Sequence, residues 1–227
     1  MERTVTAVGV LDKAFTLLEL VRDRPRTLRE LVDASALSKA TAHRLATSLE
    51  DHGMLRRDSD GRYHLGLGSL AYAAAARASL PLEQAARAAL TNLRDSTGES
   101  SQLYVRRGRE RVCVLSLESA HGLRTIVRAG ETLPHEVGSG GRALTDARVI
   151  GAGWVASVAE REPGVASVSA PVFGDDGHVA GAVGISGPIE RLGQLPGDRY
   201  GDAVVAAARA VEAASGFEPA APADPQP

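Results

Sequence analysis

The 227-residue chain contains one cysteine, Cys113, and no apolar run long enough to span a membrane. A single cysteine excludes an internal disulfide and a cysteine-based zinc cluster, and it fits a reducing compartment. We expect Cys113 to be a small buried apolar residue. The first ten residues carry charges where a signal peptide needs an apolar core. The sequence therefore predicts a folded cytoplasmic protein with no membrane partner.

The chain also lacks a strong net charge, which is only −2. Overall composition therefore gives no sign of a polyanionic partner. Residues 1–80 have a net charge of +2 and the remainder −4, an asymmetry that is compatible with DNA binding by local patches without establishing it. The hydrophobic share of 44% is enough to fill real cores, so we expect folded domains.

The N-terminal part begins with two predicted helices. Apolar residues recur at helical spacing over 8–21, and the charged run 22–26 ends that helix. Thr27 and Glu30 have the spacing of a capping box, in which each residue bonds the backbone amide of the other. The spacing predicts a second, short helix over 28–34.

A third helix and a hairpin follow, and together they predict a winged helix-turn-helix. Ser38 can cap the third helix, which runs to about His52. Short strands over 55–57 and 62–65 are joined by the turn 58–61, whose Asp-Gly pair suits a positive φ.

The second helix of a helix-turn-helix enters the major groove, where its side chains reach base edges and phosphates. The predicted outward face here has short hydrogen-bonding groups, two long cations and no carboxylate between Ser38 and Leu49. The alternative is an ordinary solvated face in a protein-binding winged helix, which explains His43 equally well. The candidate DNA contacts are Thr27, Ser38, Lys39, Thr41, His43, Arg44, Thr47, Ser48, Arg56, Arg57 and Arg62, with Lys39 and Arg44 the strongest.

The rest of the chain predicts an α+β sensor-like domain. Residues 67–79 are rich in alanine and suit a connecting helix, and Pro81 marks a boundary. Strands mostly linked by hairpins, with helices at the ends of the segment, indicate an antiparallel sheet. The predicted helices are 82–96 and 199–215, and the predicted strands are 100–106, 111–118, 124–127, 167–173 and 178–186. The expected divisions are a DNA-binding domain over 1–66, a linker helix over 67–80, the sensor-like domain over 81–217, for which the resemblance described next implies effector binding, and a disordered tail over 218–227.

Several motifs, all in one order, resemble those of the IclR family of bacterial transcriptional regulators. They are GVLDKAFTLLELV, the stretch from Thr27 to Gly66, LRDSTGESSQLYVRRG, GETLPHEVGSGGRAL, EREPGVASVSAPVF and AVGISGPIERL, and they span about residues 9–217. The sequence of these motifs is most similar to that of NdgR-type regulators of amino-acid metabolism. The resemblance implies a winged helix, a linker helix and a GAF-like effector domain, in a repressor or activator that binds a palindromic double-stranded DNA operator as a homodimer or homotetramer.

A two-fold assembly is also expected on physical grounds. One recognition helix reads too few base pairs to specify a single site in a genome, and pairing two copies doubles the number of base pairs read. The apolar surface expected on the helices 8–21 and 67–79 offers a dimer face, although core packing explains part of it.

The resemblance further implies an effector pocket, built from the loop after the central strands and from two late sheet segments. Glycines would allow close approach of backbone amides, a helix starting near Gly141 would offer those amides to a carboxylate, and serines would add neutral donors. A small carboxylic acid or an amino acid fits this chemistry. The candidate effector contacts are Gly140, Gly141, Ala143, Ser157, Glu160, Ser167, Gly184 and Ser186.

The chain departs from the family's pattern in this region. The family often has an aspartate where Ser157 stands and a cysteine where Ser167 stands. Only eight residues separate Leu144 from Gly153, where relatives have a longer segment with a helix flanking the pocket. The short segment favours, as an alternative, a regulator that binds DNA without any small molecule.

An enzyme is the remaining alternative. Cys113, His121, His135, Glu160 and several serines supply nucleophile and base types, but none lies in a recognisable nucleophile elbow, phosphate loop or metal-ligand spacing. We therefore expect no catalytic residue, no metal and no cofactor.

Overall fold

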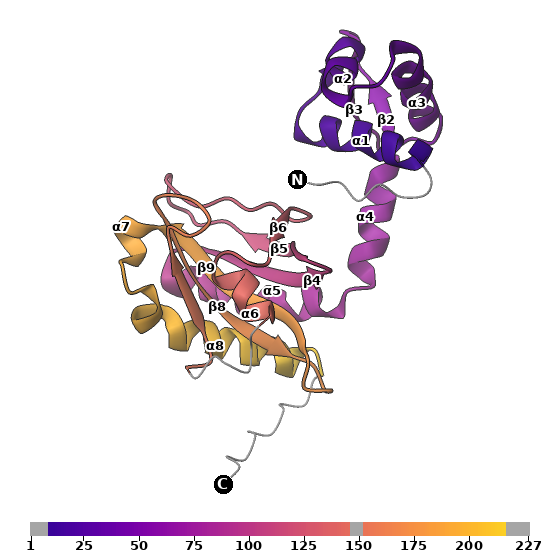
Figure 1. Ribbon diagram of the computed structural model, residues 1–227. Coiled ribbons are helices and arrows are strands. Elements are labelled where there is room, and N and C mark those ends of the chain that lie inside the picture. The colour runs from indigo at the N-terminus through magenta and orange to yellow at the C-terminus, as the bar shows by residue number, and fades with distance from the viewer. Residues whose placement is uncertain (1–8, 146–151, 217–227) are drawn as a thin grey trace. The chain divides into compact units, whose positions relative to one another are not determined.

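The computed structural model describes residues 9–145 and 152–216 (Figure 1). It divides into two compact units, Met1–Ser79 and Leu80–Pro227. The predicted α+β class, with an N-terminal winged helix and a C-terminal antiparallel sheet, is confirmed. The tail predicted over 218–227 lies outside the described residues. Within those residues, every helix is too short or too polar to cross a bilayer.

The N-terminal unit packs helices against a small antiparallel sheet. Its core joins Leu17, Leu31, Leu45 and Tyr63, all nearly inaccessible to solvent. The sheet order is β1-β3-β2, so the wing hairpin carries an extra strand that the sequence pattern did not predict. The elements are α1 (Gly9–Asp23), β1 (Arg26–Thr27), α2 (Leu28–Ser35), α3 (Lys39–Asp51), β2 (Leu55–Arg57), β3 (Arg62–Leu65) and α4 (Gly68–Ala78).

Local side-chain bonds explain where α2 and α3 begin. The Thr27 hydroxyl accepts the amide of Glu30 at 3.3 Å, and the Glu30 carboxylate accepts the amide of Thr27 at 2.7 Å, which is the predicted capping box. The Ser38 hydroxyl accepts the amide of Thr41 at 3.2 Å and so caps α3. After α3 the chain turns at Gly53, whose φ of 67° favours glycine.

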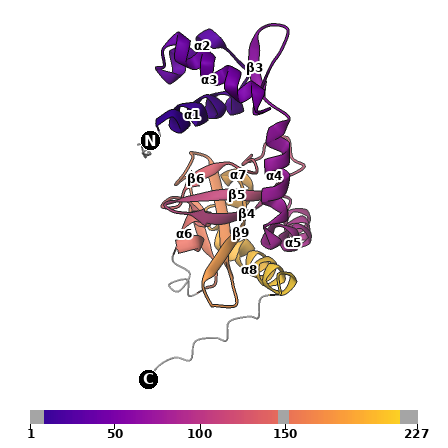
Figure 2. The ribbon, with the colours of Figure 1, turned by 90° about the vertical axis from the view of Figure 1, so that its right-hand side faces the viewer.

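The C-terminal unit is a six-stranded antiparallel sheet with helices on both faces (Figures 1 and 2). The helices α5 and α8 cover one face, where Leu90, Leu103 and Val204 are buried, and α6 lies on the other. The strand order is β6-β5-β4-β9-β8-β7. The elements are α5 (Pro81–Thr97), β4 (Ser100–Arg107), β5 (Glu110–Leu117), β6 (Thr132–Pro134), α6 (Ser139–Thr145), β7 (Val155–Val158), β8 (Val165–Phe173), β9 (Val179–Pro188), α7 (Ile189–Leu192) and α8 (Pro196–Ala214).

The strand predicted over 124–127 is wrong. That segment has no regular secondary structure, and the strand that pairs with β5 lies further along the chain, at β6. The apolar spacing arises because Val127 is buried in the cluster beneath α6. The carbonyl of Thr125 accepts a bond from the Ser100 hydroxyl at 2.8 Å instead of a strand partner.

Candidate functional site

The outer face of α3 is exposed and cationic. Lys39, His43, Arg44, Thr47 and Ser48 are all exposed, whereas Ala42, Leu45 and Ala46 face the core. Among the described residues, Lys39 and Arg44 have neither a salt bridge nor a side-chain hydrogen bond. Both cations are therefore available to an external anion, and the helix places them on the surface that a groove would meet.

Three of the polar candidates have structural partners as well. Ser38 and Thr41 bond each other through their hydroxyls at 2.9 Å, and Thr41 is half-buried. Thr27 belongs to the capping box, and its hydroxyl lies 3.0 Å from a Glu30 oxygen. These side chains shape the start of each helix, so a role at DNA would be additional to that one.

Several donors and cations surround the Glu30 carboxylate in the first turn of α2. The backbone amide of Thr27, followed by the Arg24 guanidinium at 2.8 Å and the Thr27 hydroxyl, lowers the pKa of Glu30 to about 2. Arg62 of the wing lies 3.6 Å from the same carboxylate. The wing is thus linked to α2 by charge, and to β1 just before α2 by strand pairing.

The three wing arginines differ in their surroundings. Arg62 pairs with Glu30, and Arg57 stacks over the Tyr63 ring at 5.5 Å while donating to the Gly61 carbonyl. Arg56 is exposed and has no ion pair among the described residues. Of the three, Arg56 is the one with neither an ion pair nor a side-chain hydrogen bond or ring contact among the described residues.

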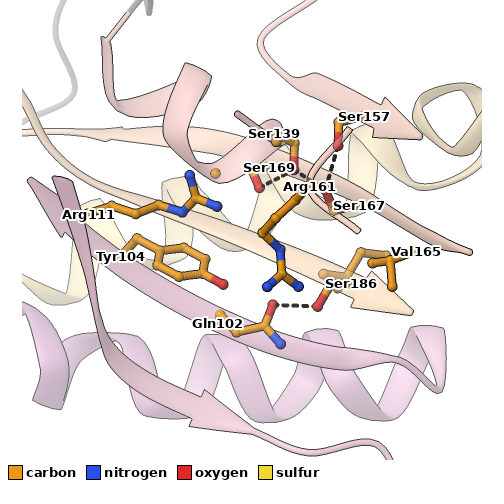
Figure 3. Close-up of a pocket in the computed structure, with 13 residues that line it drawn as sticks. Gln102, Tyr104, Arg111, Ser139, Ser157, Arg161, Val165, Ser167, Ser169 and Ser186 are labelled. Carbon is orange, nitrogen blue, oxygen red and sulfur yellow. Dashed lines mark hydrogen bonds between the residues drawn. The ribbon is translucent and has the colours of Figure 1, made fainter. Parts of the chain in front are cut away.

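A second candidate site is a small pocket under α6 in the C-terminal unit (Figure 3). Its floor consists of residues that share one face of the sheet, because the register places Gln102 opposite Gly184 and Ser167 opposite Ser186. The free space is only about 30 Å³, which holds about one or two water molecules. The lining residues are Gln102, Tyr104, Arg111, Gly138, Ser139, Gly140, Ser157, Arg161, Val165, Ser167, Ser169, Ile185 and Ser186.

Serine hydroxyls dominate one wall of the pocket. Ser139 bonds Ser167 at 2.7 Å and Ser169 at 2.8 Å, and Ser157 lies 3.2 Å from Ser167. Gly184 makes this network fit, since a Cβ there would lie 2.2 Å from the Ser169 hydroxyl. Opposite the serines, Ser186 donates to the Gln102 carbonyl oxygen at 3.2 Å, and the buried Gln102 amide nitrogen has no partner among the described residues.

Two guanidinium groups give the pocket its charge. Arg111 is 3% exposed, lies 5.3 Å from the centre of the Tyr104 ring, and donates to the carbonyls of Pro134 and Val137. Burial lowers the pKa of Arg111, and the nearby charge of Arg161 lowers it further. The lining contains no aspartate or glutamate, so both positive charges lack a counter-charge on the pocket wall.

The structure brings together half of the predicted effector contacts. Gly140, Ser157, Ser167 and Ser186 line the pocket. The other four do not: Gly184 lies beneath Ser169, Gly141 packs against the His135 carbonyl, Ala143 is buried beside Leu144, and Glu160 bonds Arg142 at 2.9 Å.

The residues that sequence reasoning missed include the most polar ones. Gln102, Tyr104 and Arg111 lie on β4 and β5, far from the glycine and serine motifs in the sequence. Alternation along β4 was the only available signal, because it places Gln102 and Tyr104 on one face. Arg161 adjoins a predicted contact, Glu160, but the sequence pattern did not predict it as a pocket residue.

Comparison with protein families finds one family over both units of the chain. Residues 10–59 match the IclR helix-turn-helix domain, and residues 146–213 match the C-terminal domain of the bacterial transcriptional regulator IclR. The chain belongs to the IclR family. It is an IclR-type transcriptional regulator with a DNA-binding domain and an effector domain. The placement among NdgR-type regulators remains a prediction.

Curated relatives and solved structures extend over most of this IclR-type chain. The regulator KipR of Bacillus subtilis is 27% identical over 210 residues, which cover 77% of this chain and 84% of KipR. The glycerol operon regulatory protein of Streptomyces griseus is 28% identical over 217 residues, which cover 80% of this chain and 85% of that protein.

Two solved structures share the fold. An IclR regulator from Alicyclobacillus acidocaldarius has a TM-score of 0.75 at 22% identity, covering 92% of this chain and 100% of its own. An IclR homologue from Microbacterium hydrocarbonoxydans, solved with 4-hydroxybenzoate, has a TM-score of 0.74 at 21% identity, and the match covers 91% of this chain and 98% of the homologue.

Proposed function

We propose that this regulator reads its operator through the exposed face of α3, with Lys39 and Arg44 as the main cations and Arg56 as the contact from the wing. These three side chains have no ionic partner among the described residues, and no carboxylate interrupts the face between Ser38 and Leu49. Arginine and lysine bind phosphates, and arginine also reads guanine in the major groove.

The same proposal includes a homodimer. Val10, Leu11 and Phe15 of α1 are each more than half exposed, and α4 buries no residue although Leu70 and Tyr72 lie on it. Large apolar side chains gathered on the surface of one small unit favour association with a partner. A second copy is the natural partner, because it also doubles the length of DNA that is read.

The pocket supports a small organic acid as the effector. The single observation that carries this proposal is the positive charge of the pocket lining. Arg111 and Arg161 line the pocket, and no carboxylate does. An acid would pair with the guanidinium groups, but the ammonium group of an amino acid would face them without a counter-charge. The 4-hydroxybenzoate bound to the homologue from Microbacterium hydrocarbonoxydans is an acid of this kind.

Effector binding would control transcription by changing how the two recognition helices of the dimer are placed. A ligand can do this only if it binds one arrangement more tightly than the other, and couplings of about 1–3 kcal/mol are typical.

Isothermal titration of the full chain tests the choice of effector class. The probes are 4-hydroxybenzoate, benzoate and succinate against alanine and glutamine. We expect at least one acid to bind, to lose affinity in Arg111→Lys, and to keep it in Arg107→Lys, a control on the exposed end of β4. Tighter binding of the amino acids would contradict the proposal.

A regulator without a small-molecule effector is the second candidate, and the small free volume of about 30 Å³ favours it. If no acid and no amino acid binds in the titration, this second candidate replaces the first.

A further inference from the structure

The pocket under α6 is occupied by one of its own side chains. Figure 3 shows Arg161 reaching into the pocket toward Gln102 and Ser186. The free volume of about 30 Å³ is what remains beside it, and it is too small for any acid of the proposed class. A ligand can enter only if something moves, and the Arg161 side chain stands where the ligand would lie.

Arg161 is held in the pocket by few bonds. Among the described residues its one ion pair is with its neighbour Glu162, at 3.6 Å and with the glutamate largely exposed. Its charge also acts unfavourably on Arg111, whose pKa it lowers. The pocket therefore gives this guanidinium no strong partner of its own, and an arriving anion would supply one.

Arg161 lies on a short hairpin turn, residues 159–164, that joins β7 to β8. Both ends of the turn have backbone conformations of the left-handed region, with φ of 55° at Ala159 and 80° at Gly164. Ala159 is one of two non-glycine residues with positive φ in the described chain. A positive φ is usual for glycine in a hairpin turn, but it is uncommon for a residue such as Ala159.

One ion pair ties this turn to α6. Arg142 of α6 donates to the Glu160 carboxylate at 2.9 Å and also to the carbonyl of Ala156 on β7. The second Glu160 oxygen accepts the amide of Gly138 at 3.2 Å, just before α6. Glu160 thus points away from the pocket interior and fastens its rim, while the next residue, Arg161, points inward.

We propose that the turn 159–164 is a gate over the pocket, latched by Glu160 to Arg142 and Gly138, with Arg161 as a plug that an acid displaces and then binds. The proposal rests on the pocket being a ligand site, as proposed above. It changes the role of Glu160 from a ligand contact to a latch, and it makes Arg161 the residue that selects an anion.

A thiol placed deep in the pocket measures the opening of the gate without any ligand. Ser169→Cys puts a thiol on a pocket residue that is 2% exposed. The native Cys113 is fully buried, and burial raises its pKa to about 12, so it reacts only when the unit unfolds. Labelling by a disulfide reagent such as dithiobis-nitrobenzoate, followed for each thiol by mass spectrometry, separates gate opening from unfolding.

The comparison uses Glu160→Ala in the Ser169→Cys background of the full chain. The control is Glu118→Ala, which removes a similar partly exposed ion pair, Glu118 to Arg124 at 2.7 Å, away from the pocket. We expect Glu160→Ala to speed labelling at position 169 by about two- to tenfold, and Glu118→Ala to leave it unchanged. Cys113 should stay unlabelled in both variants.

Equal labelling rates for Glu160→Ala and its control would overturn the gate, as would a parallel rise in labelling of Cys113, because that indicates unfolding. If Ser169→Cys does not fold, Ser186→Cys reports on the same pocket, since Ser186 is 6% exposed. The rate needs no ligand, so a failure of the titration with acids would remove the proposed effector class while the result for the gate stands.

Discussion

At the scale of single residues, the fold separates cations that hold the structure from cations that are free to bind. Arg24 and Arg62 surround the Glu30 carboxylate, and Arg111 donates to two carbonyls. Lys39 and Arg44 have no such partner among the described residues. Sequence reasoning could rank these two highest because the helical period places them outward, but it could not find Arg111, whose role depends on strand packing.

Replacement of Arg44 by alanine should weaken operator binding. The loss should be about 1–3 kcal/mol if the guanidinium makes a bidentate contact to a guanine. Fluorescence anisotropy with a labelled operator fragment measures the change. Arg22→Ala, which removes an exposed arginine at the end of α1, is the control and should bind as the unaltered protein does. Equal affinity for both variants would remove Arg44 from the DNA interface.

The Glu30 carboxylate should make the N-terminal unit sensitive to acid. Its pKa falls from the ordinary 4.5 to about 2 in the folded chain, so the folded state favours the charged form. The resulting stabilisation is fully present above pH 4.5 and is lost as the pH falls toward 2.

Denaturant unfolding of Glu30→Gln beside the unaltered protein checks this dependence. The free-energy difference between the two should be constant above pH 5 and should shrink progressively at lower pH. A difference that does not change with pH would show that the charge of Glu30 adds nothing to its hydrogen bonds.

At the scale of elements, segments with a repeated apolar period or a clear turn signal were predictable, and short strands without either were not. Helices such as α3 and α8 were predicted close to their bounds because their apolar spacing repeats several times, and the short wing strands because the Asp-Gly turn between them marks a hairpin. The strands β1 and β7 have two and four residues and offer no period. The segment 124–127 was predicted as a strand and is not one, because its apolar pattern reflects burial against the sheet and not strand pairing.

The edge strand β7 is held by a contact that the sequence did not suggest. Trp154, the one tryptophan of the chain, precedes β7 and lies against Gly197 and Gly201 of α8. A Cβ at Gly201 would lie 2.2 Å from the indole nitrogen of Trp154. The two glycines, one helical turn apart, thus make room for the ring.

Gly201→Ala should displace Trp154 and loosen β7. We expect a loss of about 1–3 kcal/mol in the free energy of unfolding, as overpacking in a filled site typically causes. The tryptophan emission should also shift to longer wavelength as the ring meets water. Gly122→Ala is the control, because a Cβ there meets nothing within 4 Å. An unshifted emission with unchanged stability would show that the two glycines of α8 do not position Trp154.

At the scale of the whole molecule, family membership and the separate sites agree on one function. Both family domains are present, and the exposed cations lie on the helix that this domain type inserts into DNA. The sequence motifs were sufficient for the family and for the location of the pocket, since they lie at α6, β8 and β9. They did not indicate the two arginines that line the pocket, Arg111 on β5 and Arg161 on the turn before β8.

The most direct test of the account is binding of the full chain to fragments of its own chromosome at about 50 and 200 mM salt. We expect a few palindromic fragments to be retained selectively, with affinity that falls as salt rises. The double variant Lys39→Ala with Arg44→Ala should lose the selection and show a shallower salt dependence. If the unaltered protein shows no salt-sensitive preference for any fragment, or if the double variant selects the same fragments as tightly, then α3 does not read DNA.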